Sequence, residues 1–173
     1  IKRKLLLETI AFVGAAGARQ QDPVGILGFT DKVVINIPAR CGLNNFHYLL
    51  RNTFDFFETN NHHKFRKTDF FAGFDSLRRV YDKPCFVPVI SDFIGFEKII
   101  RSPLFRLVKS RHELIFIFLD DPLEFARNSG WGYLKVEDIE TGRSSVVSRR
   151  KIRKSDLDLR RQRKALRQEL KRM

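Results

Sequence analysis

The carboxylate of Asp92 is the first candidate for chemistry because it stands at the end of an apolar run. Residues 84–93 read PCFVPVISDF. A continuous apolar run of this length is typical of a strand buried on both faces of a helix-covered sheet. In such sheets ligands bind in the crevice beyond the carboxyl ends of the strands. Asp92 is therefore a candidate binding residue, and the alternative is that it only caps the following segment.

Thr68 and the pair Asp120–Asp121 are further oxygen donors at the ends of predicted elements. Thr68 opens a helix-like segment, so its alternative role is that of an N-cap. Asp120 and Asp121 follow the apolar run 113–119 and suggest a metal site. Two acidic residues before a proline, here Pro122, are nevertheless more typical of a turn.

The remaining reactive side chains form no catalytic set. Cys85 lies inside the apolar run, where a nucleophile would lack both exposure and a base. Cys41 and Cys85 have no metal-type spacing, so we expect buried free thiols in a reducing cytoplasm. No glycine-rich phosphate loop is present. We expect solvated or structural roles for the four histidines, His47, His62, His63 and His112. The sequence thus indicates no enzyme.

Composition and charge limit the class of protein. The 173 residues are 43% hydrophobic and 31% charged, enough for one domain with a sizeable core. No run reaches the roughly 18 to 20 apolar residues of a membrane span, and we expect neither a transmembrane segment nor a signal peptide. Of the net charge of +13, residues 149–173 carry +9. A basic tail is weaker evidence for nucleic-acid binding than a basic face, so nucleic acid is not the favoured partner.

Alternating helical and apolar segments predict the elements that position these residues. Strands are expected over residues 24–29, 32–38, 84–90, 113–119, 132–136 and 144–147, the first two as an antiparallel hairpin. Helices are expected over residues 2–19, 43–57, 68–81 and 94–108, the last broken near Pro103, and from Ser155 as N-cap. The buried stripe of the second helix is predicted to be Phe46, Leu50, Phe54 and Phe57. The pattern predicts an α/β fold with a mostly parallel sheet.

Four short motifs resemble the von Willebrand factor A domain. Residues 24–31 (VGILGFTD), 67–69 (KTD), 89–93 (VISDF) and 120–124 (DDPLE) follow the order and spacing of that family. With the basic helix after them, they resemble one bacterial branch of uncharacterised function, the domain-of-unknown-function 58 family. Members of that branch are often encoded beside MoxR-type AAA+ ATPases. The resemblance implies a three-layer sandwich with one antiparallel edge strand, divided into residues 1–148 and a basic helix over 149–173.

The resemblance also implies a metal-ion-dependent adhesion site. A divalent ion, usually Mg²⁺, is held there by an Asp-x-Ser-x-Ser loop, a threonine that matches Thr68, and an aspartate that matches Asp92. The chain departs from this pattern, because it has no Asp-x-Ser-x-Ser sequence and no first central strand. Either the strand lies upstream of Ile1 or the site is degenerate. In both cases this chain should bind Mg²⁺ poorly, and no other cofactor is expected.

Pro88 departs from the family pattern as well. It removes a hydrogen-bond donor from a strand that should be internal, which a bulge or a missing neighbour would accommodate. The function implied is a non-catalytic protein-interaction domain, a partner or adaptor of a MoxR-type ATPase, with Thr68, Asp92 and Asp31 around its crevice. The alternative is a protein that binds nucleic acid or acidic surfaces through its C-terminal helix.

Overall fold

The computed structural model of the chain describes residues 2–59, 68–120, 133–137 and 144–172, with side chains of the last two ranges described from Leu157 onward. The chain forms two compact units, Ile1–Leu119 and Asp120–Met173. None of the helices in these ranges is long and apolar enough to cross a membrane. The predicted helical turn at 122–127 and the polar loop with His62 and His63 lie outside the described residues.

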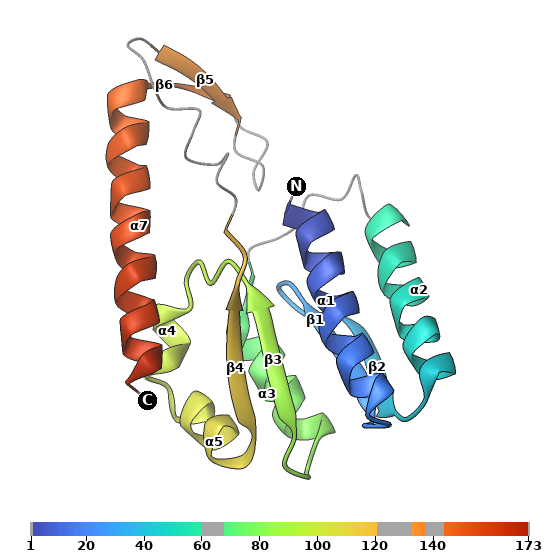
Figure 1. Cartoon of the computed structure of the whole chain (residues 1–173). Coiled ribbons are helices and arrows are strands. Elements are labelled where there is room, and N and C mark those ends of the chain that lie inside the picture. Colours follow the sequence, from blue (N-terminus) through green and yellow to red (C-terminus); the bar gives the residue numbers. More distant parts are fainter. Residues whose placement is uncertain (1, 60–67, 121–132, 138–143, 173) are drawn as a thin grey trace. The chain divides into compact units, whose positions relative to one another are not determined.

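The first half of the first unit is a β-hairpin covered by helices (Figure 1). Helix α1 (Lys2–Arg19) leads into strands β1 (Val24–Phe29) and β2 (Val33–Arg40), which pair antiparallel, and helix α2 (Leu43–Thr59) follows. Small residues let α1 approach its neighbours. A Cβ on Gly14 would lie 2.7 Å from a ring carbon of Phe46 in α2, so a larger residue there would have to displace this ring. The predicted hairpin and both helices are confirmed.

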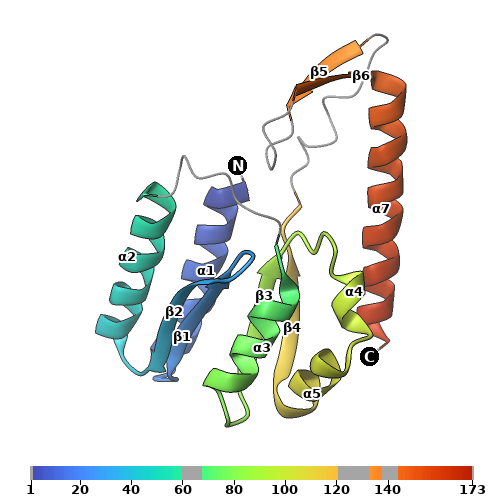
Figure 2. The same cartoon turned by 180° about the vertical axis from the view of Figure 1, so that it is seen from behind.

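The second half is a parallel strand pair with its connecting helices, seen from both sides in Figures 1 and 2. Helix α3 (Phe70–Val80) precedes strand β3 (Phe86–Ser91), and helices α4 (Glu97–Ile100) and α5 (Pro103–Arg111) lead to strand β4 (Glu113–Phe118). Ser102 caps α5 by accepting a hydrogen bond from the Phe105 N–H, and Pro103 occupies the first turn. The break predicted near Pro103 therefore separates two helices.

Phenylalanine rings form the core of this half. Phe93 and Phe96 are 1% and 0% exposed, and their ring centroids lie 5.2 Å apart. Edge-to-face and tilted contacts of this kind stabilise the cluster beyond the burial of their area. The other rings that contact these two belong to α3, α5 and β4: Phe70, Phe74, Phe105, Phe116 and Phe118.

The second unit contains a hairpin and the long basic helix. Strands β5 (Tyr133–Glu137) and β6 (Ser144–Ser148) pair antiparallel, and helix α7 (Arg149–Lys171) follows without a break. The prediction that Ser155 caps this helix is wrong, because the helix begins at Arg149 and Ser155 lies within it.

The sheet differs from the predicted one. The chain is mixed α/β, but the described strands form three separate two-stranded sheets, and the only parallel pair is β3–β4. No residue of β3 is buried, contrary to the expectation of a strand buried on both faces. The physical reason is that no described strand pairs with its second edge. Neither cysteine is buried as predicted: Cys41 is exposed because it lies in the loop before α2, and Cys85, just before β3, is half-buried.

Candidate functional site

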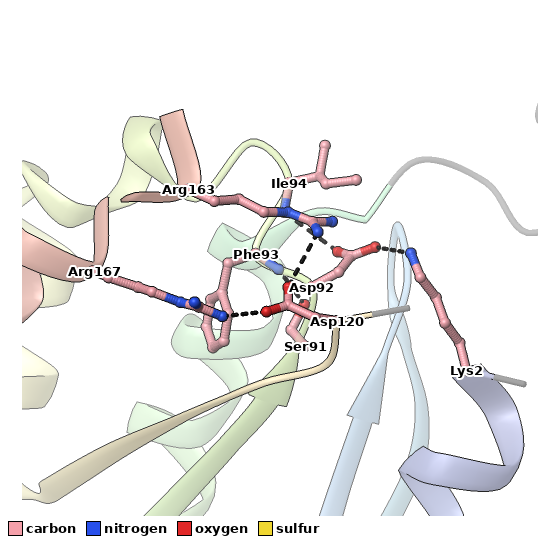
Figure 3. Close-up of polar contacts among 8 residues, drawn as sticks. All are labelled: Lys2, Ser91, Asp92, Phe93, Ile94, Asp120, Arg163 and Arg167. Carbon is pink, nitrogen blue, oxygen red and sulfur yellow. Dashed lines mark hydrogen bonds and ion pairs between the residues drawn. The ribbon is translucent and has the colours of Figure 1, made fainter. Parts of the chain in front are cut away.

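A tight turn at the carboxyl end of β3 carries the candidate residue Asp92 (Figure 3). Ser91 Oγ accepts a hydrogen bond from the Phe93 N–H at 3.1 Å, and Asp92 Oδ1 accepts one from the Ile94 N–H at 3.3 Å. Phe93 adopts a φ of 56°, a left-handed conformation that is unusual for a bulky residue. The side chains of Ser91 and Asp92 therefore stabilise a strained turn. Asp92 caps the segment that follows it, which was the alternative to a binding role.

The second oxygen of Asp92 forms an ion pair with the first turn of α1. Lys2 Nζ lies 3.2 Å from Asp92 Oδ2, and the two side chains are 31% and 32% exposed (Figure 3). A half-exposed pair of this kind is screened by water and contributes little to stability. It nevertheless supplies the positive charge that faces the carboxylate. Lys2 is a site residue that the sequence reasoning missed, because nothing in its local pattern points to β3.

The segment that carries Thr68 lies against the β1–β2 turn. Asp69, not Thr68, is the N-cap of α3, because its side chain accepts the Phe71 N–H. Thr68 is exposed. The Asp69 N–H donates to the Thr30 carbonyl at 2.7 Å, and the Thr30 hydroxyl donates to Asp31 Oδ1 at 3.0 Å. The contact brings the chain around Thr68 to the hairpin turn that contains Asp31.

Aromatic packing joins this segment to the turn after β3. The Phe70 ring stacks on the Phe93 ring with centroids 6.2 Å apart, and it meets the Phe29 ring edge-on at 5.8 Å. Phe70 follows Asp69, Phe93 follows Asp92, and Phe29 precedes the hairpin turn. The turns after β1 and β3 and the Thr68–Asp69 segment before α3 therefore adjoin one aromatic cluster, at the carboxyl ends of these two strands.

Asp120, at the start of the second unit, is paired with two arginines of α7. Its Oδ1 lies 3.2 Å from Arg163 Nη1, and its Oδ2 contacts Arg167 Nη2 (Figure 3). The Arg163 side chain is 10% exposed, so this contact is the more sheltered of the two. Asp120 thus anchors α7. Its neighbour Asp121 lies outside the described residues.

The donor set around Asp92 does not fit a Mg²⁺ site. Mg²⁺ needs several oxygen ligands in an octahedron. One Asp92 oxygen accepts a backbone N–H and the other faces the Lys2 ammonium. Within the described residues, no three His, Cys, Asp or Glu side chains are grouped so that they could hold a metal ion.

His112 is a buried polar residue at the opposite, amino end of the β3–β4 pair. Its Nδ1 accepts the Cys85 N–H at 3.2 Å, and only 3% of the residue is exposed. Burial lowers the pKa of His112, and the charge of Arg111 lowers the same pKa further. Burial also raises the pKa of the nearby Tyr81. These contacts give His112 the structural role expected for the histidines.

Residues 1–168 match the model of a family described as "Protein of unknown function DUF58". Neither the curated proteins nor the solved structures contain a match.

Proposed function

Because the chain belongs to the DUF58 family, whose function is unknown, we propose a role from its residues: a non-catalytic protein-interaction domain of the von Willebrand factor A type. By the resemblance of its motifs, its partner is a MoxR-type AAA+ ATPase, for which the domain serves as an adaptor. The partner contacts the loops that carry Asp31, Thr68 and Asp92.

The observation that carries this proposal is that the turns with Asp31 and Asp92 and the Thr68–Asp69 segment adjoin one aromatic cluster. The stack of Phe70 on Phe93 and the bond from Asp69 to Thr30 hold these loops on packed elements. Loops fixed in this way lose little conformational freedom on binding, which favours recognition of a partner. Asp92 is committed to its turn and to Lys2, so exposed Thr68 is the better candidate for direct contact.

The test is a pull-down of a MoxR-type ATPase by the full chain and by Thr68→Ala. Loss of the Thr68 hydroxyl should weaken capture of the ATPase at least several-fold, since the change is exposed and leaves the cap of α3 in place. Thr9→Ala is the matched control, because Thr9 lies in α1 and its hydroxyl donates to the Leu5 carbonyl of its own helix. Equal capture by all three proteins would reject the proposal.

The exposed cations of α7 favour a second function, binding of nucleic acid or another acidic surface. Arg161, Lys164 and Lys171 are exposed, whereas Leu166 in the same helix is 2% exposed. Exposed cations attract phosphate and other anionic groups by charge, which is the basis of this second proposal.

A further inference from the structure

Four cations of α7 lie on one narrow flank of the helix. Each residue of an α-helix advances about 100°, so side chains three or four positions apart lie one above another. The four residues are all exposed and follow one another in steps of four, three and four positions: Arg160, Lys164, Arg167 and Lys171. By the helical geometry their directions fall within about 60° of one another. These four residues form the cation row.

The other sides of α7 differ in character from the cation row. The acidic residues Asp158 and Glu169 lie about 150–170° from the middle of the row, on the opposite flank. Leu166, which is 2% exposed, faces a third direction, about 130° from the row. An anionic ligand is therefore attracted to one flank of the helix and repelled by the opposite one.

The shape of the cation row suits a line of anionic groups rather than a plane. With a rise of 1.5 Å per residue, the row covers about 16 Å of the helix axis. A membrane surface meets cations over the whole exposed side of a helix that lies on it, whereas the phosphates of a nucleic-acid strand follow one line. A duplex carries one negative charge per roughly 1.7 Å of its axis, so a segment of this length has phosphates for every cation of the row.

We propose that the cation row binds the phosphate backbone of a nucleic-acid duplex without reading its bases. This role rests on the second function proposed above and narrows its ligand from acidic surfaces in general to a duplex. Residues 149–173 contain no Phe, Trp, Tyr or His, so this segment has no ring on which an unpaired base could stack. A single strand therefore binds more weakly than a duplex, and affinity for the duplex does not depend on its sequence.

The experiment measures binding of a labelled DNA duplex of mixed sequence by fluorescence anisotropy over a range of salt concentrations. The row variant combines Lys164→Gln with Lys171→Gln. The matched control combines Arg161→Gln with Arg172→Gln, which removes two exposed charges of the same segment, one beside the row and one after the end of the helix. The row variant should bind several-fold more weakly, and its plot of log affinity against log salt should be shallower by about 2. The control should keep the slope of the wild type.

Three other anionic ligands separate the duplex from acidic surfaces in general. The wild-type chain is titrated with one strand of the same duplex, with vesicles that contain phosphatidylserine, and with polyglutamate. The duplex should bind most tightly of the four. Equal losses in the row variant and its control, or another ligand that binds as tightly as the duplex, would overturn the proposal for the cation row alone. If the wild type bound none of the four at low salt, the second function itself would be rejected together with it.

Discussion

At the scale of single residues, Phe93 combines a strained backbone with a buried side chain. A left-handed conformation costs a non-glycine residue roughly 1–2 kcal/mol. Phe93 has a φ of 56° and is only 1% exposed, with its ring centroid 4.4 Å from that of Phe118. Packing of the ring, together with the hydrogen bonds accepted by Ser91 and Asp92, must offset that strain.

Because of this strain, Phe93→Gly should be less destabilising than Phe93→Ala, which is the reverse of the usual order. Phe93→Ala should lose about 3–5 kcal/mol of unfolding free energy, and Phe93→Gly should lose roughly 1 kcal/mol less because glycine tolerates positive φ. The control is Phe96, which is equally buried but has a φ of −67°. There glycine should be worse than alanine by about 0.5–1 kcal/mol. Urea unfolding of the four variants measures both differences. If alanine were more stable than glycine at both positions, or less stable at both, the inferred strain at Phe93 would be contradicted.

His112 predicts a loss of stability in mild acid. Its pKa is lowered in the folded chain, first by burial and then by Arg111, so the unfolded chain binds the proton more readily. The contribution of neutral His112 to the free energy of unfolding is fully present above the unfolded pKa of about 6.5. It is lost as pH falls through the lower folded pKa. A proton on His112 Nδ1 would also remove the hydrogen bond that this nitrogen accepts from the Cys85 N–H.

The measurement is unfolding free energy against pH for the wild type, His112→Gln and His47→Gln. The slope below pH 6.5 should flatten in His112→Gln. It should persist in His47→Gln, because His47 is exposed. If the dependence of unfolding free energy on pH below 6.5 were unchanged in His112→Gln, a group other than His112 would be its cause.

The candidate residues were only partly predictable from the sequence. Asp92 could be found because it ends an apolar run. Its partner Lys2 is 90 positions away, and no local pattern encodes such a contact. At α3 the pattern predicts Thr68 as the cap, whereas the side chain of the next residue, Asp69, bonds to the Phe71 N–H. Both types cap well, so the choice depends on the backbone conformation at the boundary.

At the scale of elements, the buried face of α2 shows where periodicity misleads. The predicted stripe used steps of four residues from Phe46, yet Phe54 is 52% exposed. Each residue of an α-helix advances 100°, so two steps of four drift about 80° from the starting face. The observed face steps by three and then four, through Leu49 to Thr53, and both of these residues are 1% exposed. Thr53 can be buried because its hydroxyl donates to the Leu49 carbonyl.

The packing of α3 on β1 depends on Gly73. A Cβ on this residue would lie 2.6 Å from ring carbons of Phe29. Gly73→Ala should therefore destabilise the chain by about 1–3 kcal/mol, although alanine is the better helix former. Ser76→Ala, in the same helix, is the control and should be near neutral. In a Phe29→Leu background the loss from Gly73→Ala should shrink, and additive losses in this double-mutant cycle would argue against the contact.

At the scale of the whole molecule, the net charge of +13 raises the question of whether charge alone or its place in α7 determines binding. Residues 149–173 hold +9 of it, and Arg163 and Arg167 are engaged by Asp120. Arg161, Lys164 and Lys171 of α7 are exposed to solvent, where phosphate groups can approach them. Binding through them should fall steeply with salt, because each neutralised phosphate releases counterions.

Two triple variants with the same net charge separate these causes. Arg161, Lys164 and Lys171, all exposed on α7, are changed to Glu in one variant. Lys83, Lys98 and Arg106, all exposed in the first unit, are changed to Glu in the other. If α7 is the binding surface, the first variant should bind a DNA duplex at least about tenfold more weakly at low salt, and its affinity should vary less with salt. The second should lose far less. Equal losses would mean that net charge alone attracts the duplex, and no binding by the wild type at low salt would remove nucleic acid as a partner of α7.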